Sequence, residues 1–404
     1  MRIIIAGQSY YPAANGQAIF TVNLAESMAQ AGHQVMVITA SDQTHAYRAL
    51  RNGVRVEAIT AVPLSLWHPD TYLTLLPGSQ VNRLFNEFQP EVVHIQDHYP
   101  LSRSVARAAR KRHLPLIGTN HFLPENITHY VPMPAWCRAG FNRLLWMTML
   151  DVYNRVDIAT VATETGVEIL RRAGIRAPVY SVSCGIDLNR FHLDAGVDRV
   201  ELRRCYGLDP TSIVFLFVGR VDQEKRLDVL LRALRRLDRN DLQLAIAGHG
   251  ARLKSLQSLA QQLKLGQKVV FTDFIPAQDL PALLNSVDIF AMPSEAELQS
   301  IATLEAMACG RPVLAANARA LPELVENGVN GYLFRAGDVE DAARCMVRLA
   351  DQRESWVAMS AASLAKVRSH SLSNSFRHFR ELYRSLLPGY AAQRTQQLSP
   401  TGNR

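Results

Sequence analysis

The chain is poor in cysteine, with five among 404 residues. They are odd in number and widely spaced, so we expect neither a disulfide framework nor a CxxC metal pattern. This usage favours a reducing compartment such as the cytoplasm. The apolar run that begins at Ile3 is shorter than the core of a signal peptide. No run approaches the roughly 20 apolar residues that would cross a bilayer, so we expect a cytoplasmic protein that does not span a membrane.

The chain also lacks a basic tail of the kind that binds nucleic acid, and we expect no nucleic-acid partner. Its 44 Lys and Arg against 36 Asp and Glu give a net charge of +8, which is spread along the sequence. Such a diffuse excess is compatible with a weak attraction to anionic lipids or phosphorylated substrates.

Short apolar runs alternate with helical patterns from one end to the other, which is typical of parallel sheets covered on both faces. The predicted strands of the first half are 3–6, 35–39, 54–59, 92–95, 116–119, 158–162 and 179–182, and those of the second half are 213–218, 242–247, 269–272, 289–292 and 313–316. Helical patterns cover 21–31, 101–112, 227–237, 253–263, 303–308 and the tail from 339 to 387.

A polar, turn-rich stretch at 184–210 separates the two series. We therefore predict an α/β fold with two doubly wound Rossmann-like domains, 1–190 and 191–371, that face a cleft. A final helix and tail, 372–404, is expected to cross back to the first domain. Ligands of this architecture bind at the carboxyl ends of the strands.

Several catalytic motifs are missing. No Asp-x-Asp follows a strand, and no cluster of histidines and carboxylates has the spacing of metal ligands. A Gly-x-Ser-x-Gly elbow and a P-loop are also absent, which disfavours a serine hydrolase and an ATPase of that type. We expect no metal and no cofactor, so that Arg, Lys and helix amides would hold any diphosphate.

The segment 293–313 carries the strongest signal. A buried strand ends at Met292, and a helix is predicted from about Gln299 to Gly310. The free amides of Leu298, Gln299 and Ser300 would form an anion site at the start of that helix. Glu297 and Glu305 would lie roughly 12 Å apart on a helix, which suits two carboxylates gripping one extended ligand. Taken as an isolated pair, they are better explained as a solvated helix-start acid, Glu297, and a partly buried structural acid, Glu305.

Arg220 and Lys225 follow another predicted strand, where two cations could neutralise a diphosphate. Gly219 would allow the backbone to approach closely beside Arg220. The alternative is that Arg220 pairs with a neighbouring acid, while Arg226, Arg232 and Arg236 form a solvated helix face.

Gly248 and Gly250 lack the third glycine of a dinucleotide fingerprint, so a tight turn explains them better. In the first half His121 follows a strand and should project into the cleft, although a histidine at the core's edge is the alternative. Gly16 lies in a loop that enters a helix, where a missing Cβ leaves room for a ligand. Asp97 and His98 also end a strand and could meet acceptor hydroxyls.

Together these motifs resemble the retaining glycosyltransferases of family 4, which have the GT-B fold. The resemblance covers nearly the whole chain in the right order. Its strongest segment is the Glu–seven residues–Glu spacing followed by Glu-Ala-Met-Ala-Cys-Gly-Arg-Pro-Val. The other matching segments are 217–225, 247–250, 288–294 and 325–334, with looser matches at 10–16, 118–121 and 184–191.

The resemblance implies a retaining, metal-independent hexosyltransferase that uses a nucleoside-diphosphate sugar, a UDP-sugar rather than a GDP-sugar. It implies that Arg220 and Lys225 contact the diphosphate, Glu305 the ribose, and Glu297 and His121 the transferred sugar. The other donor-binding positions it implies are Gly219, Gly248, Gly250, Leu298, Gln299 and Ser300, and Gly16 and Asn120 would belong to the acceptor or phosphate loops. The rival functions are a sugar phosphorylase, a nucleotide-sugar epimerase, a non-catalytic nucleotide-sugar-binding module and, last, an NAD-dependent dehydrogenase.

The acceptor is indicated only indirectly. The family usually has Gly-Phe-Gly-Leu after the first Glu, whereas this chain has Leu298-Gln-Ser-Ile301. That departure looks closer to diacylglycerol glycosyltransferases and so to a role in glycolipid biosynthesis, and residues 120–126 resemble the same branch. The segment 130–153 combines aromatic and aliphatic residues with Arg138 and Arg143, which suits a helix in a membrane interface.

The segment 64–76 offers a second apolar surface, and residues 103–112 form a basic helix that could face anionic lipid. We therefore expect peripheral association with the inner face of the cell membrane and a lipid acceptor. The alternatives are a buried helix, ordinary solvated arginines and a soluble acceptor.

Overall fold

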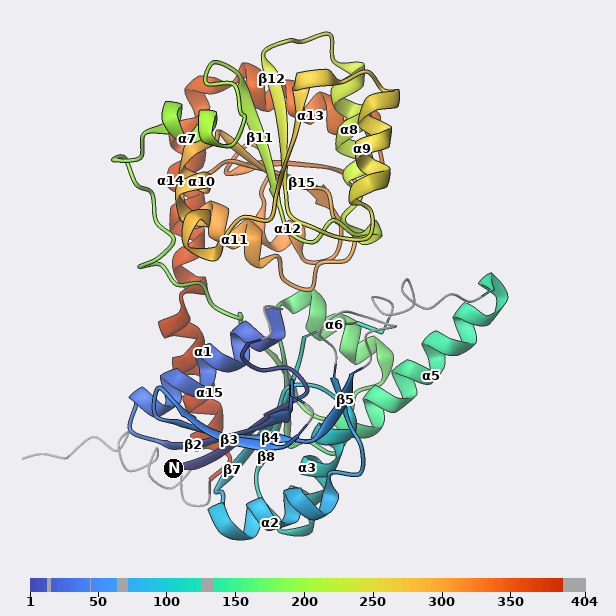
Figure 1. Cartoon of the computed structure of the whole chain (residues 1–404), viewed down its shortest axis with the longest axis vertical. Helices are drawn as coiled ribbons and strands as arrows, with labels where there is room; N and C mark the ends of the chain where they lie inside the picture. The colour runs from blue at the N-terminus through green and yellow to red at the C-terminus, as the bar shows by residue number, and fades with distance from the viewer. Residues whose placement is uncertain (13–15, 44, 64–71, 122, 125–133, 388–404) are drawn as a thin grey trace, which may run out of the picture. The chain divides into compact units, whose positions relative to one another are not determined.

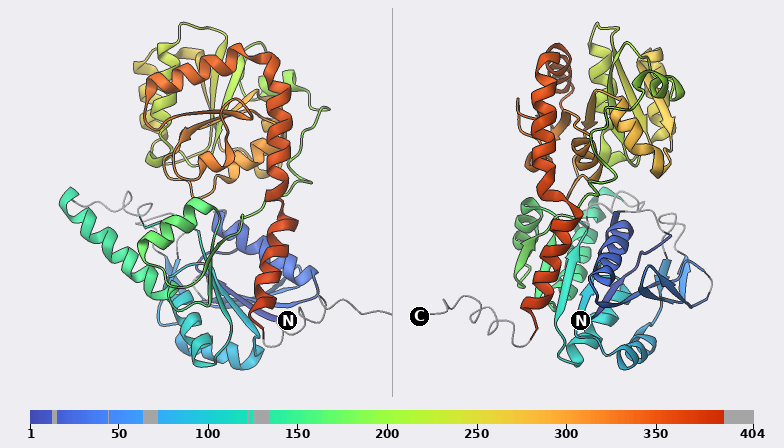
Figure 2. Two further views of the ribbon diagram at one scale, coloured as in Figure 1. Left: turned by 180° about the vertical axis from the view of Figure 1, so that it is seen from behind. Right: turned by 90° about the vertical axis from the view of Figure 1, so that its left-hand side faces the viewer.

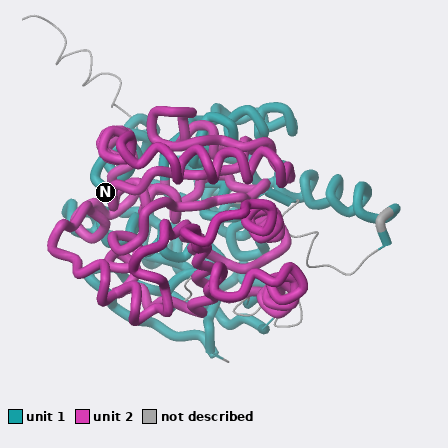
Figure 3. The backbone as a smooth tube through the Cα atoms, turned by 90° about the horizontal axis from the view of Figure 1, so that it is seen from above, with its two compact units in different colours: residues 1–183, 373–404 teal, residues 184–372 magenta. Residues whose placement is uncertain are grey.

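A computed structural model describes residues 1–12, 16–43, 45–63, 72–121, 123–124 and 134–387. The chain divides into two compact units (Figure 3). Unit 1 comprises Met1–Ser183 and Ser373–Arg404, and unit 2 comprises Cys184–Leu372. The first division therefore falls seven residues before the predicted boundary at 190.

Unit 1 contains an eight-stranded sheet in the order β10-β9-β8-β7-β1-β2-β4-β3. Its strands are β1 (Arg2–Gly7), β2 (Gln34–Ala40), β3 (Tyr47–Arg51), β4 (Val54–Ile59), β7 (Val92–Ile95), β8 (Leu116–Asn120), β9 (Ile158–Val161) and β10 (Val179–Ser181). All neighbours are parallel except β3, which pairs antiparallel with β4. A small antiparallel ribbon joins β5 (Ala61–Pro63) to β6 (Tyr72–Thr74).

The direction of each crossover determines which face of the sheet the helices of unit 1 cover. Because parallel crossovers are right-handed, the connection from β1 to β2 and the connections from β7 through β10 place their helices on opposite faces. The helices are α1 (Gly16–Gln30), α2 (Gly78–Phe88), α3 (Pro100–Lys111), α5 (Ala135–Tyr153), α6 (Glu164–Ala173) and α15 (Leu372–Ser385). The aromatic ring of Phe379 on α15 packs 5.5 Å from that of Phe20 on α1, so the last helix belongs to the α1 face of unit 1 (Figures 1 and 2).

Unit 2 contains a six-stranded, all-parallel sheet in the order β13-β12-β11-β14-β15-β16. Its strands are β11 (Ile213–Val218), β12 (Leu242–Ala247), β13 (Val269–Asp273), β14 (Ile289–Met292), β15 (Val313–Asn317) and β16 (Gly331–Arg335). Its helices are α7 (Arg199–Cys205), α8 (Leu227–Arg236), α9 (Leu253–Gln262), α10 (Leu280–Ser286), α11 (Ile301–Ala308), α12 (Leu321–Leu324), α13 (Val339–Asp351) and α14 (Trp356–Val367). Helix α13 packs on α8, whereas α7 packs on α10 and α14 on α11.

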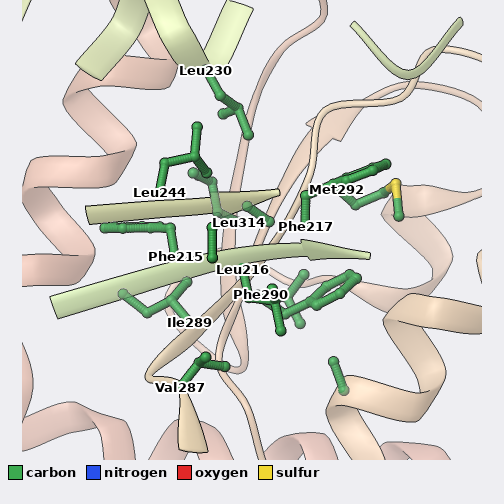
Figure 4. Close-up of a cluster of buried hydrophobic side chains, with 14 of the residues drawn as sticks. Phe215, Leu216, Phe217, Leu230, Leu244, Val287, Ile289, Phe290, Met292 and Leu314 are labelled. Atoms are coloured by element: carbon green, nitrogen blue, oxygen red, sulfur yellow. The ribbon is translucent and has the colours of Figure 1, made fainter. Parts of the chain in front are cut away.

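The central strands of unit 2 are apolar on both faces because helices cover both. Strand β11 reads Ile-Val-Phe-Leu-Phe-Val, and its first five residues are buried. Figure 4 shows Phe215, Leu216 and Phe217 of this strand among Ile289 and Phe290 of the adjacent β14 and Leu314 of β15 beyond it. This core fixes the carboxyl ends of β11 and β14, from which the candidate site is built.

The two Rossmann-like sheets confirm the predicted fold class, and all twelve predicted strands are present. Four strands were missed: β3, β5, β6 and β16. Strand β3 is a mostly exposed edge strand and β5 and β6 have three residues each, so none carries a strong apolar pattern. Strand β16 begins with Gly331, whose close approach to Val313 leaves no room for a Cβ atom.

Candidate active site

The loops after β11 and β14 meet at the point where the strand order of unit 2 reverses. From β11 the chain proceeds outward through β12 to β13, and from β14 it proceeds the other way through β15 to β16. The loops therefore diverge to opposite faces and leave the carboxyl edge between β11 and β14 open to ligands. Arg220 and Lys225 lie in the first loop, and Glu297 lies in the second.

Several contacts fasten these two loops together. The Lys225 Nζ donates to Glu297 Oε1 at 2.5 Å. On either side, the amide of Glu295 donates to Glu224 O at 3.1 Å, and Arg226 Nη1 lies 2.5 Å from Glu295 Oε1. The side chains of Lys225 and Glu297 are only 16% and 11% exposed. The structure thus brings together two of the predicted site residues as one half-buried ion pair.

Arg220 lies at the surface of the same loop and is 52% exposed. Its guanidinium contacts two buried acids, Asp222 Oδ2 at 2.9 Å and Glu224 Oε1 at 3.0 Å. The alternative given for Arg220, that it pairs with a neighbouring acid, is therefore what the structure shows. Arg226 was predicted to be solvated, which is wrong, because its ion pairs with Glu295 and Asp228 hold it partly buried. Arg232 and Arg236 are exposed, as predicted.

Gly248 and Gly250 let the loop after β12 lie directly on the loop after β11. A Cβ atom on Gly248 would come within 1.9 Å of Gly219 O, and one on Gly250 within 2.4 Å of Val221 O. The φ angles of Gly219 and Gly248 are 150° and 138°, which side chains rarely adopt. These glycines therefore make a close packing of loops possible beneath Arg220, and the amide of Ala251 donates to Asp222 Oδ1 there.

Helix α11 begins at Ile301, two residues later than predicted. Ser300 is the N-cap, and its hydroxyl accepts a hydrogen bond from the amide of Thr303. The predicted anion site on the amides of Leu298, Gln299 and Ser300 therefore precedes the helix, and the first-turn amides belong to Ile301 and Ala302. Gln299 uses its Oε1 atom to accept from the amide of Cys184 at 2.8 Å, so its side chain holds the start of unit 2.

Glu305 lies on α11 among apolar residues. Leu304 and Ala306 beside it are fully buried. Burial raises the pKa of the Glu305 carboxyl to about 7, against a smaller opposing effect of Arg190. A carboxyl in this state can accept hydrogen bonds from ligand hydroxyls without first losing a salt bridge to a neighbouring lysine or arginine.

In unit 1 the strand order reverses between β1 and β7, and a second polar cluster lies at that carboxyl edge. Asp97 is buried at its centre. Its Oδ2 atom accepts from the Gln8 amide at 2.5 Å and from Gln17 Nε2 at 2.9 Å, and its Oδ1 atom accepts from the Tyr99 amide at 3.1 Å. Asp97 thus connects the loops after β1 and β7 to the start of α1.

His121 follows β8 and is half-buried at the same edge. Its Nε2 atom lies 2.8 Å from Gln96 Oε1, and its ring centroid lies 4.8 Å from that of Phe20. Burial lowers the pKa of His121 to about 3, so the imidazole is neutral at physiological pH.

The remaining predicted residues of unit 1 lie nearby in the fold. Asn120 is buried and donates to the sulfur of Met149 on α5 at 3.1 Å. His98 is buried, which lowers its pKa to about 4, and its ring stacks 5.0 Å from that of Tyr99. Gly16 begins α1, and apart from its chain neighbours no atom of the described residues lies within 4 Å of where its Cβ would be.

Sequence reasoning missed the residues that hold these side chains in place. They are Gln17, Phe20, Gln96, Asp222, Glu224 and Glu295. Gln96 could have been found, since it directly precedes Asp97 at the end of a predicted strand. Asp222 and Glu224 contact Arg220 from two and four positions away, but the sequence alone does not single them out as its partners. Gln17, Phe20 and Glu295 act through contacts distant in sequence, which no local pattern reveals. Among the described residues there is no group of three or more His, Cys, Asp or Glu that could hold a metal ion.

Two family comparisons span most of the chain. Residues 14–190 match the family described as Glycosyltransferase Family 4, and residues 198–364 match Glycosyl transferases group 1. A D-inositol 3-phosphate glycosyltransferase from Saccharomonospora viridis is 30% identical over 93% of this chain and 90% of its own length. The chain belongs to glycosyltransferase family 4. It is accordingly a retaining enzyme that transfers a sugar from a nucleotide-sugar donor.

Two other relatives carry names that include lipids. A GDP-mannose-dependent alpha-(1-6)-phosphatidylinositol monomannoside mannosyltransferase from Mycolicibacterium smegmatis is 32% identical over 72% of this chain and 74% of its own. An alpha-monoglucosyldiacylglycerol synthase from Streptococcus pneumoniae is 24% identical over 83% of this chain and 75% of its own.

A likeness to solved structures supports the GT-B fold. Anabaena HepE in complex with UDP superposes with a TM-score of 0.77 at 20% identity, covering 96% of this chain and 100% of the other.

The raised pKa of Glu305 predicts that the stability of unit 2 depends on pH. Its folded pKa of about 7 lies above the ordinary value of 4.5. The folded state therefore holds its proton more tightly, and stability is lost as the pH rises from 4.5 through 7. We expect wild type to lose about 2–3 kcal/mol between pH 5 and pH 8 at this site, and Glu305→Gln to abolish that loss.

Amide hydrogen exchange of β14 and α11, corrected for intrinsic rates, measures this difference. Glu354→Gln, at an exposed position, is the matched control and should behave as wild type. Equal pH dependence of wild type and Glu305→Gln would show that Glu305 is ordinarily ionised.

Proposed function

We propose that the protein transfers a hexose from a UDP-sugar to the hydroxyl of a membrane lipid such as diacylglycerol. The observation that carries the donor half is the ion pair of Lys225 with Glu297 at the reversal point of unit 2, with Arg220 in the same loop as Lys225. Support for a UDP donor comes from the UDP-bound structure of Anabaena HepE. Support for a lipid acceptor comes from the lipid names of two relatives and from the surface of α5.

In this proposal unit 2 binds the donor. Arg220, Lys225 and the first-turn amides of α11 stabilise the negative charge on the departing diphosphate. Glu305 accepts from the ribose hydroxyls, and Glu297 accepts from hydroxyls of the transferred sugar. Gly219, Gly248 and Gly250 carry no side chain, so the loops can pack closely and the diphosphate can approach their backbone.

Unit 1 binds the acceptor and His121 contacts the sugar. The bond from the anomeric carbon to the diphosphate oxygen breaks, and a bond from that carbon to the acceptor oxygen forms on the same face. The acceptor's proton passes to the departing phosphate oxygen, so no protein nucleophile is needed and the anomeric configuration is retained.

Helix α5 supports a membrane contact. Its last turns are buried through Met149, Val152 and Tyr153, whereas its first turns extend away from the rest of unit 1 (Figures 1 and 2). The apolar side chains of Trp136, Leu144 and Met147 are 82%, 54% and 59% exposed. These three residues and the exposed Arg143 lie within about 100° around the helix axis. They form an apolar stripe with a cation beside it, as membrane-surface helices do.

Helix α3 supports a membrane contact less than its basic sequence suggests. Arg103 pairs with Asp151, Arg110 pairs with Asp157, and Arg112 donates to Asn82 and Asn86. Leu75 and Leu76, beside the β5–β6 ribbon, are exposed, while the rest of the segment 64–76 lies mostly outside the described residues. No described helix is both long and apolar enough to cross a bilayer.

Assays with defined donors and acceptors test the proposed reaction. The full chain is incubated with UDP-glucose, UDP-galactose or GDP-mannose, and with diacylglycerol in vesicles or soluble sugars. We expect glycosyldiacylglycerol from a UDP-hexose, with the donor's anomeric configuration retained in the linkage. Turnover with GDP-mannose only, or with soluble acceptors only, would contradict the donor or the acceptor respectively. Turnover of donor with inorganic phosphate or alone would indicate a phosphorylase or an epimerase.

The Lys225–Glu297 pair predicts a large catalytic effect of either residue. We expect Lys225→Ala and Glu297→Ala each to lower kcat by roughly 100-fold or more, since each removes a group that acts on developing charge or on the sugar. Glu297→Gln keeps the shape and should show a comparable loss. Circular dichroism checks that the fold persists, and Lys254→Ala on the exposed side of α9 is the control. Near-normal rates in either alanine variant would overturn the donor-site assignment.

The stripe on α5 predicts binding to anionic vesicles. We expect the wild-type chain to float with phosphatidylglycerol vesicles at low salt and to be released as salt increases. Replacing Trp136, Leu144 and Met147 together by serine should abolish flotation, whereas Val357→Ser, an equally exposed apolar position on α14, should not. Flotation unaffected by the triple change, or absent in wild type, would disprove the membrane contact.

A further inference from the structure

Gln96 contacts His121 through a side-chain hydrogen bond, and both residues belong to unit 1. The Gln96 side chain is 0% exposed, and its Oε1 atom lies 2.8 Å from His121 Nε2. An amide oxygen only accepts hydrogen bonds, so the proton in this contact belongs to Nε2. A neutral imidazole carries one N–H, which leaves the lone pair on Nδ1. Gln96 therefore sets which nitrogen of His121 can accept a hydrogen bond.

The position of Gln96 is fixed by its backbone. The Gln96 amide donates to Ala6 O at 2.8 Å, which continues the pairing of β7 with β1. Gly7 on β1 makes room for it, because a Cβ there would lie 3.0 Å from Gln96 Cβ. The oxygen that meets His121 is thus positioned by the sheet.

The stability of the fold does not account for an amide at this position. Gln96 Nε2 is buried and has no hydrogen-bond partner within the described part of the chain. A buried donor without a partner costs about 1–3 kcal/mol. An apolar side chain of similar size would avoid that cost, so the contribution of Gln96 lies in what it does to His121.

A second set of contacts fixes the plane of the His121 ring. Phe20 on α1 packs against it with centroids 4.8 Å apart, and Phe379 on α15 packs against Phe20 at 5.5 Å. His94 on the same strand as Gln96 is held separately, between Tyr383 on α15 at 2.7 Å and Thr119 at 2.6 Å. Within the described part of the chain, the ring of His121 therefore has a hydrogen-bond contact with Gln96 and an aromatic contact with Phe20.

We propose that Gln96 is a positioning residue, which holds His121 as the Nε2–H tautomer so that Nδ1 accepts a hydrogen bond from a hydroxyl of the transferred sugar. This inference rests on the proposed contact of His121 with the sugar. Without Gln96 the ring could present an N–H to the sugar in place of a lone pair.

Imidazole ¹⁵N NMR of the ligand-free full chain tests the tautomer without any activity. Signals of His121 are assigned by their loss in His121→Gln. We expect the Nε2–H tautomer in wild type and a mixture of tautomers in Gln96→Leu. A wild-type ring with its proton on Nδ1, or a tautomer unchanged in Gln96→Leu, would overturn the inference.

Kinetics test the consequence for transfer. We expect Gln96→Leu to lower kcat about tenfold while KM for donor and acceptor and the melting temperature change little. If His121→Gln leaves transfer unchanged, the proposed role of His121 fails, whereas the NMR result still decides whether Gln96 sets its tautomer. An unchanged kcat in Gln96→Leu with a reduced kcat in His121→Gln would refute Gln96 alone.

Gln96→Glu gives a readout that a merely structural role would not produce. A carboxylate facing Nε2–H favours the imidazolium, so the pKa of His121 should rise from its low value and Nδ1 should be protonated below it. Among the described residues, the neighbouring titratable groups are His94 on β7, Asp97 after it and Tyr383 on α15, which contacts His94. Helix α1 contributes Phe20 beside His121 and Gln17 beside Asp97.

We expect Gln96→Glu to keep much of its activity at pH 8 and to lose about tenfold by pH 5.5, whereas wild type shows no such acid limb. Gln261→Glu, at an exposed position on α9, makes the same change of charge elsewhere and should keep the wild-type profile. A pH profile of Gln96→Glu that coincides with that of wild type would contradict the proposal.

Discussion

The reversal of strand order between β11 and β14 is the constraint on which the candidate donor site depends. Right-handed crossovers send the chain from these neighbouring strands to opposite faces of the sheet, so their loops part at the carboxyl edge. Two loops distant in sequence can then supply side chains to one place. Glu224, Lys225 and Arg226 of one loop contact residues 294–297 of the other, and the apolar strands beneath keep both loops in register.

The same rule operates in unit 1 between β1 and β7, but the chemistry at that edge is different. The edge of unit 2 gathers ion pairs, which suits a polyanion. The edge of unit 1 gathers amides, one buried carboxylate and a neutral imidazole, and the residues that form it contain no lysine or arginine: Gln8, Gln17, Gln96, Asp97, Asn120 and His121. Such groups suit hydroxyls better than phosphates. This is the difference expected if unit 2 binds a nucleotide and unit 1 binds hydroxyl groups.

Strands and candidate residues were predictable where burial leaves a local pattern. Both faces of β11 are covered, so its apolar run is unambiguous, and polar residues that end such runs, Arg220 and His121 among them, identify the carboxyl edges. Partners that lie far away in the sequence were not predictable. Gln96 contacts His121 across 25 positions, and Lys225 contacts Glu297 across 72. Strand order brings them together, and strand order is a property of the whole fold.

If Lys225 binds the diphosphate and Glu297 the sugar, as proposed above, their ion pair couples the recognition of the two groups. When a diphosphate draws Lys225 away, Glu297 is left half-buried without a cation, and an uncompensated buried charge costs several kcal/mol. Hydroxyls of a sugar can compensate it by donating to the carboxylate. A nucleotide without its sugar would leave that cost in place. With the proposed roles of Lys225 and Glu297, the ion pair would therefore favour the intact donor over a nucleoside diphosphate, and so favour release of the product after transfer.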